Sequence, residues 1–206
     1  MTATPTTTHT APARGGESGS DSDVGVDGGA GTAPDALNGV ALAAVAALVD
    51  TVRTTPGASA TAWRAEVTWD EGFRSSARIR GFDPVRSDEP LALGGTDSAP
   101  NPVEQLLAAL GNCLAVGYAA NATAEGIALR SLRIDLAGDL DLGAFLGLRP
   151  GHAGFDTITA TVHLDTDADP AQVQRLHDAV VGSSPVGHTL QAAIPVDIQL
   201  ADGSTR

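Results

Sequence analysis

The sequence predicts an α+β domain, with antiparallel strands and helices in separate stretches of one chain. A strongly apolar helical stretch occupies the middle of the chain, and segments with a two-residue hydrophobic period lie on both sides of it. Helices and strands do not alternate regularly, as they do in parallel α/β folds. With 206 residues and 42% hydrophobic content, the chain is long enough for one domain with a substantial core.

The first 34 residues differ in composition from the rest of the chain. They are rich in Thr, Ala, Gly, Ser and Asp, and they cannot bury enough apolar surface to offset the entropy lost on ordering. We therefore expect a disordered tail over 1–34 and a single domain over 35–206. An extra helix over about 36–54 begins this domain, with Asp35 as its cap, and we expect it to serve in docking or dimer packing.

Two strands and a loop are predicted before the central helix. Alternation from Trp63 to Trp69 indicates a strand, and the residues DEG after it indicate a hairpin turn into a second strand. The two tryptophans share the even spacing of one strand face, which predicts core or dimer packing. The Pro- and Gly-rich loop over 81–102 has room for one short strand. Asp88 and Glu89 within it are interpreted as a solvated pair.

The central helix has clear signals at both ends. Asn101 is a cap residue, Pro102 suits the first helical position, and the apolar run continues to about Ala124 before Gly126 ends it. Its apolar residues cover nearly the whole circumference, a pattern typical of a helix inside a core.

The remaining elements follow the same rules. Alternation predicts antiparallel strands over 132–136 and 158–164. Asp169 caps a helix that runs to about Val181 and places His177 on its solvated side, and a short helix follows Pro185. The segment IPVDIQL, 194–200, predicts a last strand.

Composition excludes several classes of function. A formal net charge of −13 disfavours binding to nucleic acid or an anionic membrane, and the absence of lysine removes Schiff-base and P-loop chemistry. The histidines lie on separate elements without metal-ligand spacing, so we expect no metal and no cofactor. The single cysteine and the lack of a secretory signal pattern predict a cytoplasmic protein.

The run GGTDSAPNPVEQLLAALGNCLAVG, followed later by SSPVGHTL, resembles the osmotically inducible protein C (OsmC) and organic hydroperoxide resistance family, over roughly 63–200. This resemblance implies antiparallel sheets wrapped around a long buried central helix, with two chains intertwined in a homodimer. It also implies a thiol-dependent peroxidase, in which a cysteine on the central helix attacks a hydroperoxide and a second cysteine resolves it as a disulfide. Cys113 falls on the position of the attacking cysteine.

Two positions depart from the family pattern. Ser184 occupies the resolving position, and a hydroxyl cannot form a disulfide. Val103 occupies the position of the activating glutamate, and Glu104 lies about 100° further round the helix. The resemblance also implies an arginine beside the thiolate, for which the candidates are Arg64, Arg74, Arg78, Arg80 and Arg86.

We interpret the chain as an OsmC-like protein that reduces organic hydroperoxides with one cysteine and an external thiol. Cys113 and Arg86 are the predicted catalytic residues; Glu104, Ser184 and His188 are predicted to contribute to binding, with Glu104 alternatively anchoring the start of the central helix. One alternative is a noncatalytic protein that binds a lipid-like or other apolar small molecule. Another is that Cys113 is only a small buried side chain on an apolar helix face.

Overall fold

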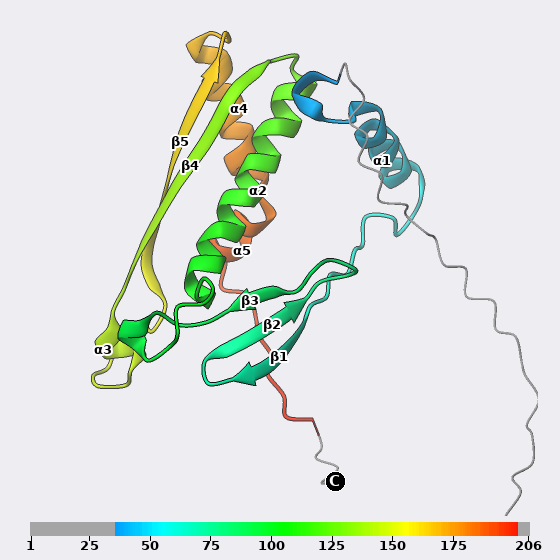
Figure 1. Cartoon of the computed structure of the whole chain (residues 1–206). Coiled ribbons are helices and arrows are strands. Elements are labelled where there is room, and N and C mark those ends of the chain that lie inside the picture. The colour runs from blue at the N-terminus through cyan, green and yellow to red at the C-terminus, as the bar shows by residue number, and fades with distance from the viewer. Residues whose placement is uncertain (1–35, 202–206) are drawn as a thin grey trace, which may run out of the picture. The chain divides into compact units, whose positions relative to one another are not determined.

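The computed structural model describes residues 36–201, so Asp35 and the predicted tail over 1–34 lie outside the described residues. The α+β class is confirmed (Figure 1). In chain order the elements are η1 (Leu37–Gly39), α1 (Leu42–Thr54), β1 (Glu66–Glu71), β2 (Arg74–Arg78), β3 (Val85–Ser87), η2 (Leu91–Leu93), α2 (Pro102–Ala124), β4 (Leu129–Leu140), α3 (Leu142–Phe145), β5 (Phe155–Thr166), α4 (Pro170–Ser183) and α5 (Pro185–Gln191).

Helix α2 begins and ends where its local signals predict. The Asn101 side chain accepts a hydrogen bond from the Glu104 amide (2.9 Å), and the Glu104 carboxylate accepts one from the Asn101 amide (2.8 Å). This capping box satisfies two amides that the first turn leaves free. Asp169 and Gln172 form the same reciprocal pair at the start of α4.

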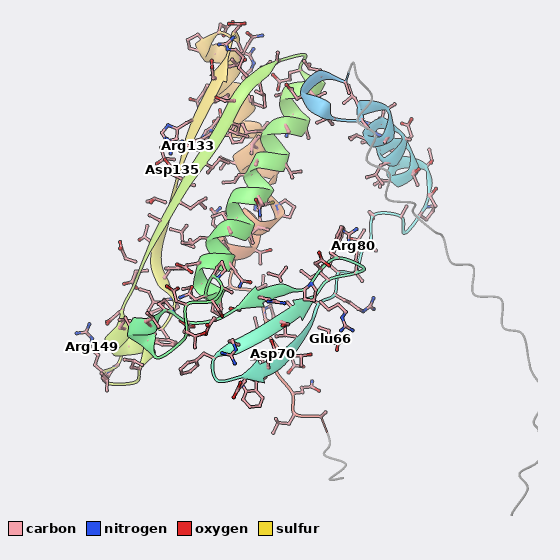
Figure 2. The ribbon with its side chains drawn as sticks, viewed as in Figure 1. Glu66, Asp70, Arg80, Arg133, Asp135 and Arg149 are labelled. Carbon is pink, nitrogen blue, oxygen red and sulfur yellow. The ribbon has the colours of Figure 1, made fainter. Side chains whose placement is uncertain are left out.

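Strands β4 and β5 form a long antiparallel hairpin beside α2 (Figure 1). Leu132 lies opposite Leu164, and Ile134 lies opposite Val162. These four side chains pack against the core, whereas Arg133 and Asp135 lie on the face of β4 that points away from α2 (Figure 2). The predicted alternation of apolar and polar faces is therefore confirmed.

The core lies where α2 meets the hairpin and helix α4. Its buried apolar residues are Leu110, Leu114, Tyr118, Ala122, Ile127, Leu176 and Val180. On the opposite side of α2, Val116 is 70% exposed, so one chain covers only part of this apolar helix. Among the described residues, α2 is also the one helix long and apolar enough to cross a membrane, but it contacts β4, α4 and α5.

The first predicted helix begins later than expected. Asn38 and Gly39 have positive φ angles of 53° and 71°, so the helix starts at Leu42 instead of residue 36. The Asn38 side chain donates to the Ile127 carbonyl (2.8 Å) and accepts from the Leu129 amide (2.8 Å). This bridge holds the segment before α1 against the connection between α2 and β4, while α1 itself has no buried residue.

Strands β1, β2 and β3 form a separate three-stranded antiparallel sheet, with β2 in the middle. The predicted hairpin is confirmed, but Trp63 precedes β1 instead of sharing a strand face with Trp69. The two tryptophans are 82% and 70% exposed. Of the two predicted roles, core packing within the chain is therefore wrong, because no element of the described chain covers these rings, whereas dimer packing stays a prediction.

Asp88 is buried and organises the loop that leads into α2, so the prediction of a solvated pair is wrong. One carboxylate oxygen accepts hydrogen bonds from the amides and hydroxyls of Thr96 and Ser98, and the other accepts from the Glu89 amide. These donors favour the ionised form and hold the pKa of Asp88 well below its usual range, with the Thr96 hydroxyl making the largest contribution. Gly95 lies within this loop, where a Cβ would sit 1.8 Å from the Glu89 carbonyl oxygen, so the loop has no room for a side chain at residue 95.

The predicted last strand does not form. Residues 194–200 are not in a strand, and their alternating apolar side chains Ile194, Val196, Ile198 and Leu200 are exposed, up to 98% at Leu200. The alternation fits a strand, but no strand of the described chain pairs with this segment. A strand needs a hydrogen-bonded partner as well as a suitable pattern.

Replacing Asp88 with Asn is expected to lower the free energy of unfolding at neutral pH. The Asn side chain would turn an N–H donor towards amides and hydroxyls that now donate to the Asp88 carboxylate. The pKa of Asp88 is lower in the folded chain than in the unfolded chain, so its stabilising effect is complete above about pH 4 and is lost as the pH falls further. The stability difference between wild type and Asp88→Asn should therefore narrow on acidification. Urea unfolding at several pH values measures this, and a difference that widens in acid would contradict the assigned role.

Candidate functional site

Cys113 lies in the middle of α2, half-buried, and faces the junction between α4 and α5. Its Sγ lies 3.4 Å from the Oγ of Ser184, a residue 71 positions later in the chain. Ser184 is only 5% exposed. The structure thus places the predicted nucleophile directly beside the residue that occupies the family's resolving position.

Local rules fix the position of Ser184. Helix α4 ends at Ser183, and α5 begins with Pro185 at its first position, so Ser184 is the cap residue between them. Its Oγ accepts a hydrogen bond from the Gly187 amide (3.1 Å). A Cβ at residue 187 would lie 3.1 Å from this oxygen, so glycine leaves the space that the cap needs.

A pocket of about 390 Å³ opens over Cys113 and Ser184. It is lined by Asn112, Cys113, Val116, Gly117, Val180, Ser183, Ser184 and Pro185. Gly117 permits the close approach of α2 and α4 at one wall, because a Cβ there would lie 3.0 Å from Val180 Cγ1. The pocket is mainly aliphatic, and the Ser183 hydroxyl is turned away from Cys113 to donate to the Ala179 carbonyl (2.7 Å).

Within the described part of the chain, no Asp, Glu, Arg, Lys or His side chain lines the Cys113 pocket. Arg86 lies on β3, where its carbonyl accepts a hydrogen bond from Gln105 Nε2 (2.9 Å). Arg74 pairs with Glu71 on the same sheet, and Arg80 lies over the ring of Phe82. The structure therefore does not bring the predicted arginine to Cys113 within one chain.

The two other predicted site residues also lie elsewhere. Glu104 closes the capping box of α2, and nine residues of helix place it about 13 Å along the axis from Cys113. His188 is exposed, and its Nε2 lies 2.9 Å from the Gly182 carbonyl in the last turn of α4. Their predicted roles in binding stay predictions.

One part-buried polar pair was not anticipated from the sequence. The hydroxyl of the core residue Tyr118 hydrogen-bonds with Nδ1 of His177, which joins α2 to α4. His177 is half-buried, so its predicted place on the solvated side of α4 is wrong. Burial raises the pKa of the Tyr118 phenol. The spacing Leu176, His177, Val180 put the histidine next to the apolar face of α4, which is the signal that could have found it.

Together these features define an α+β protein with one thiol on a long central helix, next to a serine cap. Residues 95–199, about half of the chain, match the family of OsmC-like proteins, and the chain belongs to this family. The predicted fold is thereby confirmed, whereas the homodimer stays a prediction. No curated protein sequence matches the chain.

Solved structures share this fold at low sequence identity. An OsmC-like protein from Mycoplasma pneumoniae is 19% identical over 65% of this chain and 89% of its own, with a TM-score of 0.56. A putative osmotic stress induced and detoxification response protein from Psychrobacter arcticus is 14% identical over 63% and 89%, with a TM-score of 0.53. A putative organic hydroperoxide resistance protein from Vibrio cholerae, with captopril bound in one of its active sites, is 14% identical over 66% and 89%, with a TM-score of 0.50.

Replacing Ser184 with Cys is expected to create an intramolecular disulfide with Cys113 after mild oxidation, because the two side-chain tips already lie 3.4 Å apart. Intact-mass analysis and a count of free thiols detect the bond. Ser183→Cys is the matched control, since the Ser183 side chain faces the Ala179 carbonyl instead of Cys113. Two free thiols persisting in oxidised Ser184→Cys would contradict the predicted geometry.

Proposed function

We propose that this protein reduces organic hydroperoxides with Cys113 as its single reacting thiol. The observation that carries the proposal is the position of Cys113, which is accessible in a pocket on the central helix and adjacent to the family's resolving position. The Vibrio cholerae protein supports it, since that protein is described as a putative organic hydroperoxide resistance protein and holds a small molecule in an active site.

The chemistry balances with one cysteine and two equivalents of an external thiol. The Cys113 thiolate attacks the outer oxygen of a hydroperoxide, the O–O bond breaks, and the alkoxide takes a proton from solvent to leave as an alcohol. The sulfur is oxidised by two electrons to a sulfenic acid. A first external thiol condenses with it, releasing water and forming a mixed disulfide, and a second thiol frees Cys113 by exchange.

We further propose that a second copy of the chain completes the site. A thiolate is favoured by nearby positive charge, and the described part of one chain supplies none to this pocket. Strand β1 of the three-stranded sheet is exposed, as are Val116 on the outer face of α2 and the apolar segment 194–200. An intertwined homodimer would cover these surfaces and bring an arginine, with the partner's Arg86 as the candidate, to Cys113.

Noncatalytic binding of an apolar small molecule is the second candidate function. The aliphatic lining of the Cys113 pocket and its lack of charge favour this alternative. In that case Cys113 serves only as a wall of the pocket. Peroxide reduction requires the Cys113 thiol, whereas binding of an apolar molecule does not.

Cys113→Ser is expected to reduce the consumption of cumene hydroperoxide to the rate of the protein-free mixture, because the hydroxyl is not a nucleophile at neutral pH. Consumption is followed with a small dithiol as reductant, and a sulfenic-acid trap is used to label the wild-type protein. Ser183→Ala is the control within the same pocket. Wild-type protein that forms no trapped sulfenic acid at stoichiometric oxidant, together with unchanged binding of Nile red by Cys113→Ser, would support the binding function instead.

The proposed dimer is expected to sediment with about twice the chain mass of 20.7 kDa. Replacing Val196 and Ile198 together with Asp should shift the protein towards the monomer, because both side chains are exposed in the single chain and would carry charge into the interface. Gln199→Asp tests the polar side of the same segment and should leave the dimer intact. A wild-type protein that sediments as a monomer at micromolar concentration would contradict this proposal.

A further inference from the structure

We propose that Ser184 is a positioning residue for Cys113, and that its hydroxyl donates a hydrogen bond to the Cys113 thiolate. The inference rests on the proposed function and adds a role for the residue that occupies the resolving position. Three features of the structure support it: the contact between the two side chains, the Gly187 amide that holds the Ser184 oxygen in place, and the lack of other polar groups aimed at the sulfur.

The Gly187 amide holds the Ser184 oxygen beside the sulfur by donating a hydrogen bond to Ser184 Oγ (3.1 Å). The Ser184 Oγ and Cys113 Sγ atoms lie 3.4 Å apart, and either can donate while the sulfur carries its proton. The thiolate has no proton and can only accept, so in that state the Ser184 hydroxyl is the donor. This arrangement is strongest when the sulfur is ionised.

The surroundings of Cys113 make this hydrogen bond important. Among the described residues that line the pocket, the other polar side chains are Asn112 and Ser183. Ser183 is committed to the Ala179 carbonyl, and Asn112 is exposed. Ser184 is nearly fully buried, so water competes little for its hydroxyl.

The same hydroxyl has a consequence for the oxidised protein. A thiol at residue 184 would condense with the sulfenic acid, with loss of water, whereas a hydroxyl leaves the S–OH group in place and can hydrogen-bond to it. The sulfenic acid therefore persists until an external thiol enters the pocket. Ser184 thus favours formation of the thiolate and leaves its oxidation product for a second molecule to reduce.

Two substitutions at residue 184 separate hydrogen-bond donation from helix capping. Ser184→Ala removes both the donor and the cap of α5. Ser184→Gly removes the donor, keeps most of the capping stability because glycine is well tolerated at a helix N-cap, and brings no charge beside the sulfur. Thr189→Ala is the matched control, since this hydroxyl on α5 donates to the Pro185 carbonyl (2.8 Å) and does not line the Cys113 pocket. Circular dichroism checks that each variant is folded.

The rate of sulfenic-acid formation with cumene hydroperoxide is expected to fall about tenfold in both Ser184→Ala and Ser184→Gly, and not at all in Thr189→Ala. The alkylation of Cys113 by uncharged iodoacetamide should reach half of its plateau rate at a higher pH in both residue-184 variants. A merely structural cap would leave Ser184→Gly close to wild type in both measurements.

The outcomes distinguish this inference from the proposed function. If wild type reacts with hydroperoxide and Ser184→Gly reacts equally fast, the donor role is wrong while the peroxidase function stands. If wild type does not react with hydroperoxide, the proposed function fails, and the iodoacetamide pH profiles still decide whether Ser184 donates to Cys113. Unchanged profiles in both variants would overturn the inference in either case.

Discussion

The close packing of α2 against α4 is the constraint on which the candidate site depends. Gly117 allows this approach, because any larger side chain there would press against Val180. The Tyr118–His177 hydrogen bond joins the same two helices. Because α5 follows α4 after a single cap residue, the position of α4 also sets the position of Ser184. A shift of α4 would therefore separate Ser184 from Cys113 without any change in either residue.

Features governed by neighbouring residues could be predicted from the sequence, and features governed by distant partners could not. Asn101 and Asp169 mark the starts of α2 and α4 because a capping box involves residues only three positions apart. The burial of Asp88 depends on donors up to ten residues away, which only the folded loop brings together. The segment 194–200 has a strand pattern but lacks a paired edge in the described chain, so the pattern alone was insufficient.

In the candidate site, too, local features could be predicted from the sequence and contacts between distant residues could not. Its thiol and its serine are 71 residues apart, and resemblance to a family, instead of periodicity or spacing, related the two positions. The hydrogen bond from the Gly187 amide could not be foreseen in detail, although the sequence Ser-Pro-Val-Gly does predict a capped short helix. The arginine partner was not predictable, because five candidates lie between residues 64 and 86, on the three-stranded sheet and in the segments beside its strands, and nothing local relates them to α2.

The packing and the electrostatics of the described chain both favour the proposed second copy of the chain. The described chain leaves apolar side chains exposed on α2, on β1 and over 194–200, surfaces of a kind that folded proteins usually cover with a partner. It also leaves the Cys113 pocket without a positive charge. A second copy would address both deficits at once, because arginines lie on the three-stranded sheet. Under this proposal the chain itself fixes the hydroxyl beside the sulfur, whereas assembly supplies the charge, so activation of the thiol becomes a property of the dimer and depends on protein concentration.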